Sequence, residues 1–112
     1  MFFKSKPAYF TLPMARAAEE LRRDSSIRLL DVRTPEEYAG GSIPGSINLP
    51  LNQIAQAPKM VADKDARLFV YCRSGARSRN ASEALAAMGY TNVTNIGGII
   101  EWPGSLERKV GA

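Results

Sequence analysis

The sequence of 112 residues has no histidine and a single cysteine, Cys72. The absence of histidine excludes a cysteine–histidine nucleophile pair, a histidine-ligated metal site and any mechanism that needs an imidazole near neutral pH. One cysteine excludes an internal disulfide and a CxxC redox pair. It also favours a reducing compartment, where a thiol stays free, and so predicts a cytoplasmic location. We expect neither a metal nor any other cofactor.

Long apolar runs and strong charge are missing as well. No stretch approaches the ~20 apolar residues of a membrane span, and the apolar start at residues 1–3 is too short for a secretory signal. The net charge is only +4, and the basic residues form no stripe with interleaved aromatics. We therefore expect neither a nucleic acid nor a membrane as a partner. The length predicts a single domain over residues 1–112, with a core at about 11–103, a short N-terminal arm and a C-terminal tail.

Strand patterns and helical patterns alternate along the chain. Apolar runs typical of buried strands occur at 29–32, 47–49, 68–71 and 93–96, and a short first strand or a loose arm fits residues 1–10. Helical spacing of apolar residues follows three points in the chain: a helix start at Thr11 and Pro13, a second helix start at Thr34, and the cysteine stretch. A weaker helical pattern at 52–61 breaks at Pro58. This alternation predicts an α/β domain with a mostly parallel sheet, flanked by helices on both faces.

The stretch 71–78 reads Tyr-Cys-Arg-Ser-Gly-Ala-Arg-Ser and joins a predicted strand to a predicted helix. A strand, a short loop with a glycine and a helix gather backbone N–H groups around one point, and with the helix dipole they form an anion site. The same field stabilises a thiolate, so we expect the pKa of Cys72 to be lowered. The alternative is that Cys72 is only a small buried apolar residue at the end of a strand.

The residues after the cysteine supply the predicted anion cradle. They are Arg73, Ser74, Gly75, Ala76 and Arg77. Their amides are expected to hold the anion, and Gly75 permits the close approach of backbone that such a loop needs. We expect Arg73 to bind the donor at the entrance. Arg77 is expected to turn inward and brace the loop, against Asp31 or a glutamate of the Glu36–Glu37 pair.

Two further residues are candidates for support of the loop. Asp31 stands at a strand end, where it serves either as a cap or turn residue or as an anchor for the cysteine loop. We favour the anchor, because an acid fits beside two arginines. Ser78 either caps the helix or donates a hydrogen bond toward the thiolate, and the residues leave both roles open.

Two motifs resemble the signatures of rhodanese-like domains. The first comprises residues 31–33, Asp-Val-Arg, with Glu37-Tyr38 and residues 41–48. The second comprises residues 71–78, followed by Gly89-Tyr90, Gly97-Gly98-Ile99 and Trp102. The resemblance covers about residues 27–103 and implies a single rhodanese-like domain with a five-stranded parallel sheet. One departure is Ser42, where the family commonly has histidine; we expect this substitution to be structural.

The resemblance also implies a thiosulfate sulfurtransferase whose Cys72 cycles through a persulfide. The sulfane sulfur would come from a small anionic donor, such as thiosulfate or a persulfide, and pass to cyanide or to a thiol such as glutathione or thioredoxin. One alternative is a non-enzymatic sulfur relay or protein-interaction module. A cysteine phosphatase or arsenate reductase fits less well. These enzymes have five residues between cysteine and arginine, whereas four separate Cys72 from Arg77 here, and a tighter loop suits a sulfur atom better than a phosphate.

Overall fold

The computed structural model describes residues 8–108, so the expectations for residues 1–7 and 109–112 lie outside the described residues. Within this range, five strands form one sheet in the order β1-β5-β4-β2-β3, and every pairing is parallel. The strands are β1 (Phe10–Thr11), β2 (Arg28–Asp31), β3 (Ile47–Asn48), β4 (Leu68–Cys72) and β5 (Val93–Gly98). The predicted parallel α/β architecture is confirmed.

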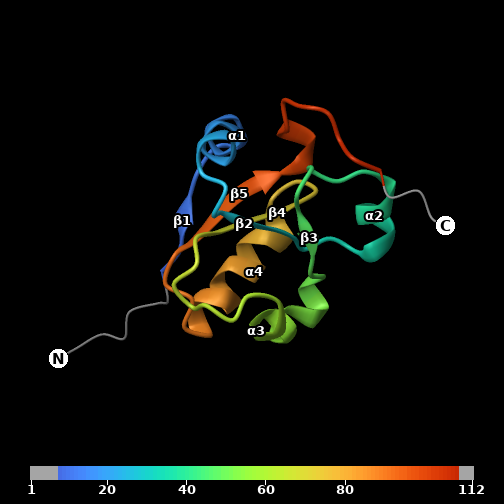
Figure 1. Ribbon diagram of the computed structural model, residues 1–112. Helices are drawn as coiled ribbons and strands as arrows, with labels where there is room; N and C mark the ends of the chain where they lie inside the picture. The colour runs from blue at the N-terminus through green and yellow to red at the C-terminus, as the bar shows by residue number, and fades with distance from the viewer. Residues whose placement is uncertain (1–7, 109–112) are drawn as a thin grey trace.

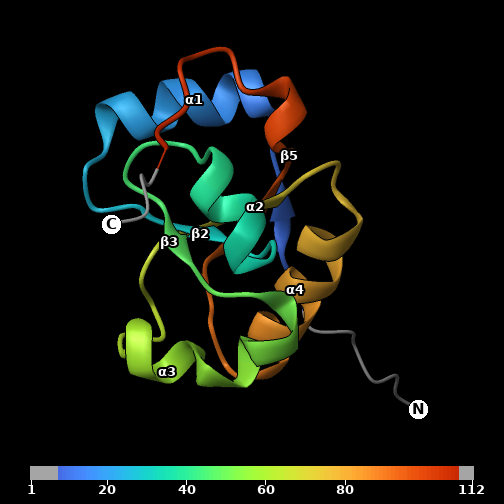
Figure 2. The same cartoon turned by 90° about the vertical axis from the view of Figure 1, so that its right-hand side faces the viewer.

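Helices cover both faces of this sheet (Figures 1 and 2). The helix α1 (Met14–Arg23) lies on one face with the 3-10 turn η2 (Ile99–Glu101), and α4 (Ala76–Ala87) lies on the other face beside α3 (Ala57–Met60). The 3-10 helix η1 (Leu51–Gln56) leads into α3, and the short helix α2 (Pro35–Gly40) lies beyond the end of β2. The chain therefore has the three layers expected when parallel strands alternate with helices.

The alternation of side chains along β4 separates two apolar cores. Phe69 and Tyr71 pack in the cluster under α1, whereas Val70 and Cys72 pack in the cluster that contains Leu85 of α4. Successive strand residues point to opposite faces, so an odd or even position decides the core that each one joins. The sulfur of Cys72 is consequently directed to the α4 side of the sheet.

Three local expectations need correction. Thr11 is the second residue of β1 and pairs with Asn95, so it does not cap α1, whose N-cap is Pro13. Pro58 does not break the helical segment, because it lies in the first turn of α3, where proline needs no N–H donor. The last strand, for which the apolar run predicts residues 93–96, is longer than expected, because β5 continues through Gly97 to Gly98.

The end of β5 lies directly against the loop that follows Cys72. A register shift between Val70 and Tyr71 lets Cys72 pair with Gly98. A Cβ atom at Gly98 would lie 2.3 Å from the carbonyl oxygen of Arg73. Glycine at this position is therefore a condition for the observed contact between strand and loop.

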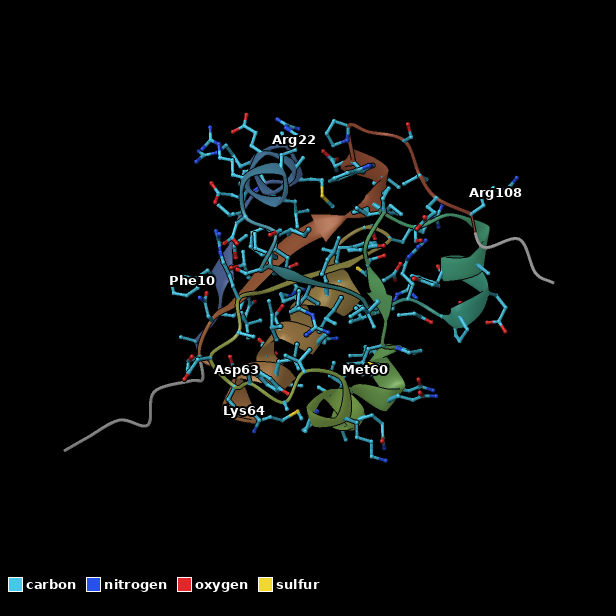
Figure 3. The ribbon with its side chains drawn as sticks, in the orientation of Figure 1. Phe10, Arg22, Met60, Asp63, Lys64 and Arg108 are labelled. Atoms are coloured by element: carbon cyan, nitrogen blue, oxygen red, sulfur yellow. The ribbon has the colours of Figure 1, made fainter. Side chains whose placement is uncertain are left out.

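Among residues 8–108, no helix is long and apolar enough to cross a membrane. Among the exposed large apolar side chains, Phe10 on β1 and Met60 at the end of α3 lie well apart (Figure 3). Single exposed apolar side chains of this kind are normal on protein surfaces.

Candidate active site

The sulfur of Cys72 lies at the point where β4 passes into α4. Cys72 is the last residue of β4 and is 1% exposed. The chain turns at Gly75, the N-cap of α4, whose φ of 117° belongs to the left-handed region that favours glycine. In this conformation the N–H of Gly75 donates to Cys72 Sγ over 3.0 Å. The loop thus places a backbone donor on the sulfur at the positive end of a helix.

Ser78 contacts the sulfur from the first turn of α4. Its side chain is buried, and its Oγ lies 3.5 Å from Cys72 Sγ and 3.0 Å from the carbonyl oxygen of Gly75. Ser78 is the third residue of α4 and not its N-cap, so of the two roles left open by the sequence the cap is excluded. Its hydroxyl is a partner of the thiol.

The surroundings of Cys72 favour ionisation. Burial by itself would raise the pKa of the thiol. Hydrogen bonds from the Ser78 side chain and from the backbone amides of Ser78, Gly75 and Ser74 oppose this, and the pKa is lowered below its ordinary value. The lowered pKa agrees with the expectation from the sequence and argues against an inert buried cysteine.

Arg77 braces the loop against α2. Its Nη1 and Nη2 donate to the two carboxylate oxygens of Glu37 over 2.7 and 3.1 Å. Hydrogen bonding to Arg77 is the main reason that the pKa of Glu37 is lowered to about 2. Thr34 and Glu37 also form a capping box, which fixes the first turn of α2. The predicted inward brace is confirmed, with Glu37 as its carboxylate.

The other members of the predicted cradle lie at its outer rim. The side chains of Arg73, Ser74 and Ala76 are exposed. The carbonyl of Arg73 accepts a hydrogen bond from the N–H of Ile100 over 3.4 Å, which ties the loop to η2. The side chain of Arg73 is exposed, and its expected role in binding the donor stays a prediction.

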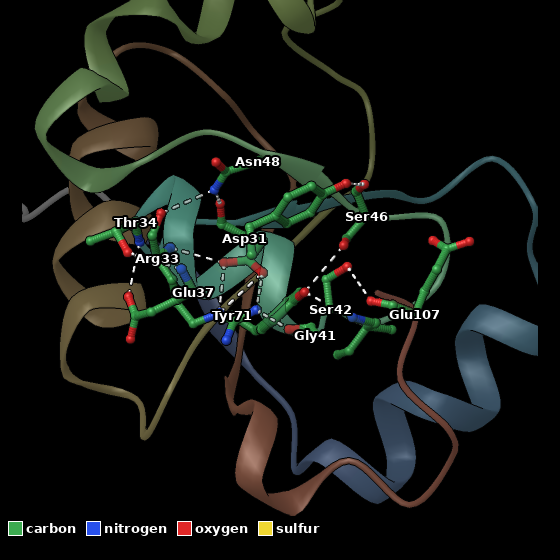
Figure 4. Close-up of polar contacts among 12 residues, drawn as sticks. Asp31, Arg33, Thr34, Glu37, Gly41, Ser42, Ser46, Asn48, Tyr71 and Glu107 are labelled. Carbon is green, nitrogen blue, oxygen red and sulfur yellow. Dashed lines mark hydrogen bonds and ion pairs between the residues drawn. The ribbon is translucent and has the colours of Figure 1, made fainter. Parts of the chain in front are cut away.

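Asp31 does not anchor the cysteine loop. Its carboxylate is fully buried and pairs with Arg33, with 2.7 Å between Oδ2 and Nη2 and 3.0 Å between Oδ1 and Nε (Figure 4). Arg33 also donates to the carbonyl of Gly41 over 2.7 Å. The expectation of an anchor for Arg73 or Arg77 is corrected, because a nearer arginine occupies the carboxylate. The i,i+2 spacing of Asp31 and Arg33 was the available signal, since such residues share one face of an extended chain.

Residues 14–104 match the family model of the rhodanese-like domain. This range contains the cysteine loop, the strands β2 to β5 and the buried Asp31–Arg33 pair. The chain belongs to the rhodanese-like domain family.

Relatives of this rhodanese-like domain are named sulfurtransferases. It is 42% identical over 71 residues to the thiosulfate sulfurtransferase PspE of Escherichia coli, covering 62% of this chain and 68% of PspE. It is 35% identical over 89 residues to the thiosulfate:glutathione sulfurtransferase of Homo sapiens, covering 67% of this chain and 77% of that one. A solved structure described as a rhodanese with anions from E. coli has a TM-score of 0.69 and 36% identity, and covers 73% of this chain and 98% of that one. These likenesses support a sulfurtransferase activity.

Ser42 holds the C-terminal tail of the rhodanese-like domain. It is fully buried, and it exchanges two backbone hydrogen bonds of 2.8 Å with Glu107. The next tail residue, Arg108, lies beside α2 (Figure 3), where its Nε donates to the carbonyl of Gly40 over 3.4 Å. These contacts support the expectation of a structural role for Ser42.

A groove adjoins the site on the far side of Arg77. It has a volume of about 620 Å³ and lies between the start of α2 and η1. Its walls include Arg33, Pro35, Leu51 and Gln53 together with Arg77. No local pattern predicts this groove, because its walls come from three separate segments of the chain. Among residues 8–108, no cluster of three or more side chains of the metal-binding types is found.

Proposed function

We propose that this protein transfers sulfane sulfur from a small anionic donor to a thiol or cyanide, through a persulfide on Cys72. The observation that carries the proposal is the 3.0 Å hydrogen bond from the N–H of Gly75 to a thiol whose pKa is lowered. A thiolate is the nucleophile that sulfane-sulfur chemistry needs. Here the thiol is activated by backbone donors and the helix end, which fits a chain without histidine.

The first half-reaction loads the cysteine. The thiolate of Cys72 attacks the outer sulfur of thiosulfate, a new S–S bond forms, and sulfite leaves with the electron pair of the broken S–S bond. Loop amides from Ser74 to Arg77 stabilise the anionic terminal sulfur of the resulting persulfide, as an oxyanion hole stabilises developing charge. Arg73 at the entrance binds the anionic end of the donor. The name of the E. coli structure, which was solved with anions, is consistent with this role.

The second half-reaction removes the sulfane sulfur from Cys72. The thiolate of an acceptor attacks the terminal sulfur, and Cys72 leaves as a thiolate, so the enzyme returns to its starting state without an added oxidant or reductant. The groove beside Arg77 is large enough for a small thiol. Glutathione is the first acceptor to test, since a human relative is named for it. Thioredoxin and cyanide are the other proposed acceptors, and a reducing compartment such as the cytoplasm completes the proposal.

Two measurements on the purified protein test this function. Thiosulfate should add one sulfur atom to Cys72, detected by mass spectrometry, and cyanide should then release it as thiocyanate with ping-pong kinetics. Cys72→Ser should abolish both. Exposed Arg79→Gln, which lies on α4 outside the loop, serves as the control and should retain sulfur loading.

The outcome separates the rival functions. A wild-type protein that gains no sulfur from thiosulfate or from a persulfide would refute the transferase and favour an interaction module. Loading without transfer to any of the small acceptors would favour a relay to a protein. Hydrolysis of an aryl phosphate that depends on Cys72 would favour a phosphatase.

A further inference from the structure

Asn95 on β5 approaches the site from behind the cysteine loop. Its Oδ1 lies 2.7 Å from the Oγ of Ser78 and 3.0 Å from the backbone nitrogen of Gly97. The Ser78 hydroxyl in turn lies 3.5 Å from Cys72 Sγ. The side chains of Asn95, Ser78 and Cys72 therefore form a continuous chain of contacts from β5 to the sulfur.

The direction of the hydrogen bonds in this chain follows from Gly97. A backbone N–H can only donate, so the atom of Asn95 that faces it must be the amide oxygen. The same oxygen faces Ser78, and the hydroxyl of Ser78 must therefore donate to it. A hydroxyl has one proton. With that proton directed to Asn95, Ser78 presents lone pairs to the sulfur and accepts a hydrogen bond from the neutral thiol.

We propose that Asn95 is a positioning residue that orients the hydroxyl of Ser78 away from Cys72, so that Ser78 accepts from the thiol in the resting protein. When the thiol ionises, Ser78 can donate to the sulfur only by turning its proton away from the 2.7 Å contact with Asn95. The hydrogen bond from Ser78 to the thiolate still lowers the pKa of Cys72, but it does so less than it would without Asn95, because the amide oxygen of Asn95 competes for the same proton. The carbonyls of Gly75, at 3.0 Å, and Gly97, at 3.5 Å, are the other acceptors within reach of the hydroxyl.

Charged groups near the thiol stay constant in this comparison. The strand β5 contributes no titratable side chain. The charged residues on the other elements around the cysteine loop are Arg73 in the loop, Arg77, Arg79 and Glu83 on α4, Glu37 on α2, Glu101 on η2, and the Asp31–Arg33 pair at the end of β2. A change at Asn95 that leaves these residues in place reports on the hydrogen-bond chain.

A double-mutant cycle tests the direction of the chain. The pKa of Cys72 is measured from the pH dependence of its alkylation by iodoacetamide. We expect Asn95→Ala to lower this pKa by about half a pH unit to one pH unit, the equivalent of one net hydrogen bond. In a Ser78→Ala background the same change should have no effect, because the hydroxyl that transmits it is gone. Asn92→Ala, on the same segment but not a partner of Ser78, is the matched control.

Two results would overturn the inference. One is a thiol pKa that is unchanged or raised by Asn95→Ala. The other is an equal shift in both backgrounds, which would mean that Asn95 acts only by bracing Gly97. If Asn95→Ala does not fold, Asn95→Asp retains both acceptor contacts. Its charge should raise the thiol pKa in both backgrounds, but more when Ser78 is present, since a carboxylate is the stronger acceptor; an equal rise would also contradict the inference.

The inference rests on the proposed function only for its effect on turnover. Alkylation of Cys72 needs no sulfur donor. The double-mutant cycle can therefore confirm the role of Asn95 even if sulfur transfer is not observed, and sulfur transfer can be observed even if the cycle refutes that role. If the role of Asn95 and sulfur transfer are both confirmed, Asn95→Ala should increase the rate of sulfur loading most at low pH, where the wild-type thiol is protonated. The difference in rate between this variant and the wild type should vanish well above the thiol pKa.

Discussion

Replacement of Gly98 by alanine should displace the cysteine loop without changing any group that takes part in the chemistry. The φ and ψ of Gly98, −113° and 144°, are open to any residue, so the effect is purely steric. The new Cβ would lie 2.3 Å from the carbonyl oxygen of Arg73 and 2.6 Å from the Cα of Ser74, whereas ordinary contacts begin at 3.4 Å. Backbone must therefore move by about an ångström, because these atoms belong to no flexible side chain.

This movement has two expected consequences. Overpacking of this kind costs about 1–3 kcal/mol of folding free energy, which urea unfolding will measure. A shift of the loop also takes the N–H of Gly75 out of line with Cys72 Sγ, now 3.0 Å away. A misplacement of ~1 Å can reduce a catalysed rate by ~10²-fold, so alkylation near neutral pH and the proposed sulfur loading should both be slower.

Gly40→Ala provides the matched control. A Cβ at Gly40 would have no atom within 4 Å, and the residue ends the helix α2. This variant should retain wild-type stability to within about 0.5 kcal/mol and wild-type alkylation. If Gly98→Ala unfolds at the wild-type urea concentration and its thiol reacts at the wild-type rate, then the contact between β5 and the loop does not hold the thiol in place, and the reasoning is refuted.

Two further changes test the ion pairs around the site. Glu37→Gln keeps the acceptor of the capping box but removes the charge opposite Arg77, and because both side chains are about one-third exposed it should cost only about 0.5–1 kcal/mol. The pKa of Glu37 is lowered from 4.5 to about 2, so the ion pair stabilises the fold fully above pH 4.5. The difference in unfolding free energy between Glu37→Gln and the wild type should therefore disappear as the pH falls toward 2. Glu36→Gln is the control, and a difference that persists at pH 2 would contradict the pairing. Asp31→Asn should lower the free energy of unfolding in urea by far more, about 3–5 kcal/mol, because it leaves the buried guanidinium of Arg33 without its counter-charge. The control Asp65→Asn, at an exposed position, should change this free energy little. Equal costs for the two variants would contradict the buried pairing of Asp31 with Arg33.

The local pattern of the chain was sufficient for the sheet and for the cysteine loop. Alternating apolar runs and helical periods depend on residues within a few positions of one another, and these contacts survive in the fold. The same holds for the turn at Gly75 and for the helix that follows it, so the backbone donors on the sulfur could be anticipated. Arg77 could be placed inward, but three acids were possible partners, since a pattern along the chain carries no information on which distant carboxylate is nearest.

The errors have the same physical origin. Asp31 was assigned to the cysteine loop, yet Arg33 occupies its carboxylate because the two side chains leave the end of β2 on one face. Gly97-Gly98 looks like a turn in isolation, but pairing with β4 extends it as strand and presses it on the loop. Nothing in the local pattern distinguishes Asn95 from the other residues of the predicted strand at 93–96. Its importance arises only when β5 lies beside β4 and brings its amide oxygen to Ser78, 17 positions earlier in the chain. Residue types and short spacings thus determine which groups can react, whereas sheet order and packing determine which of them meet.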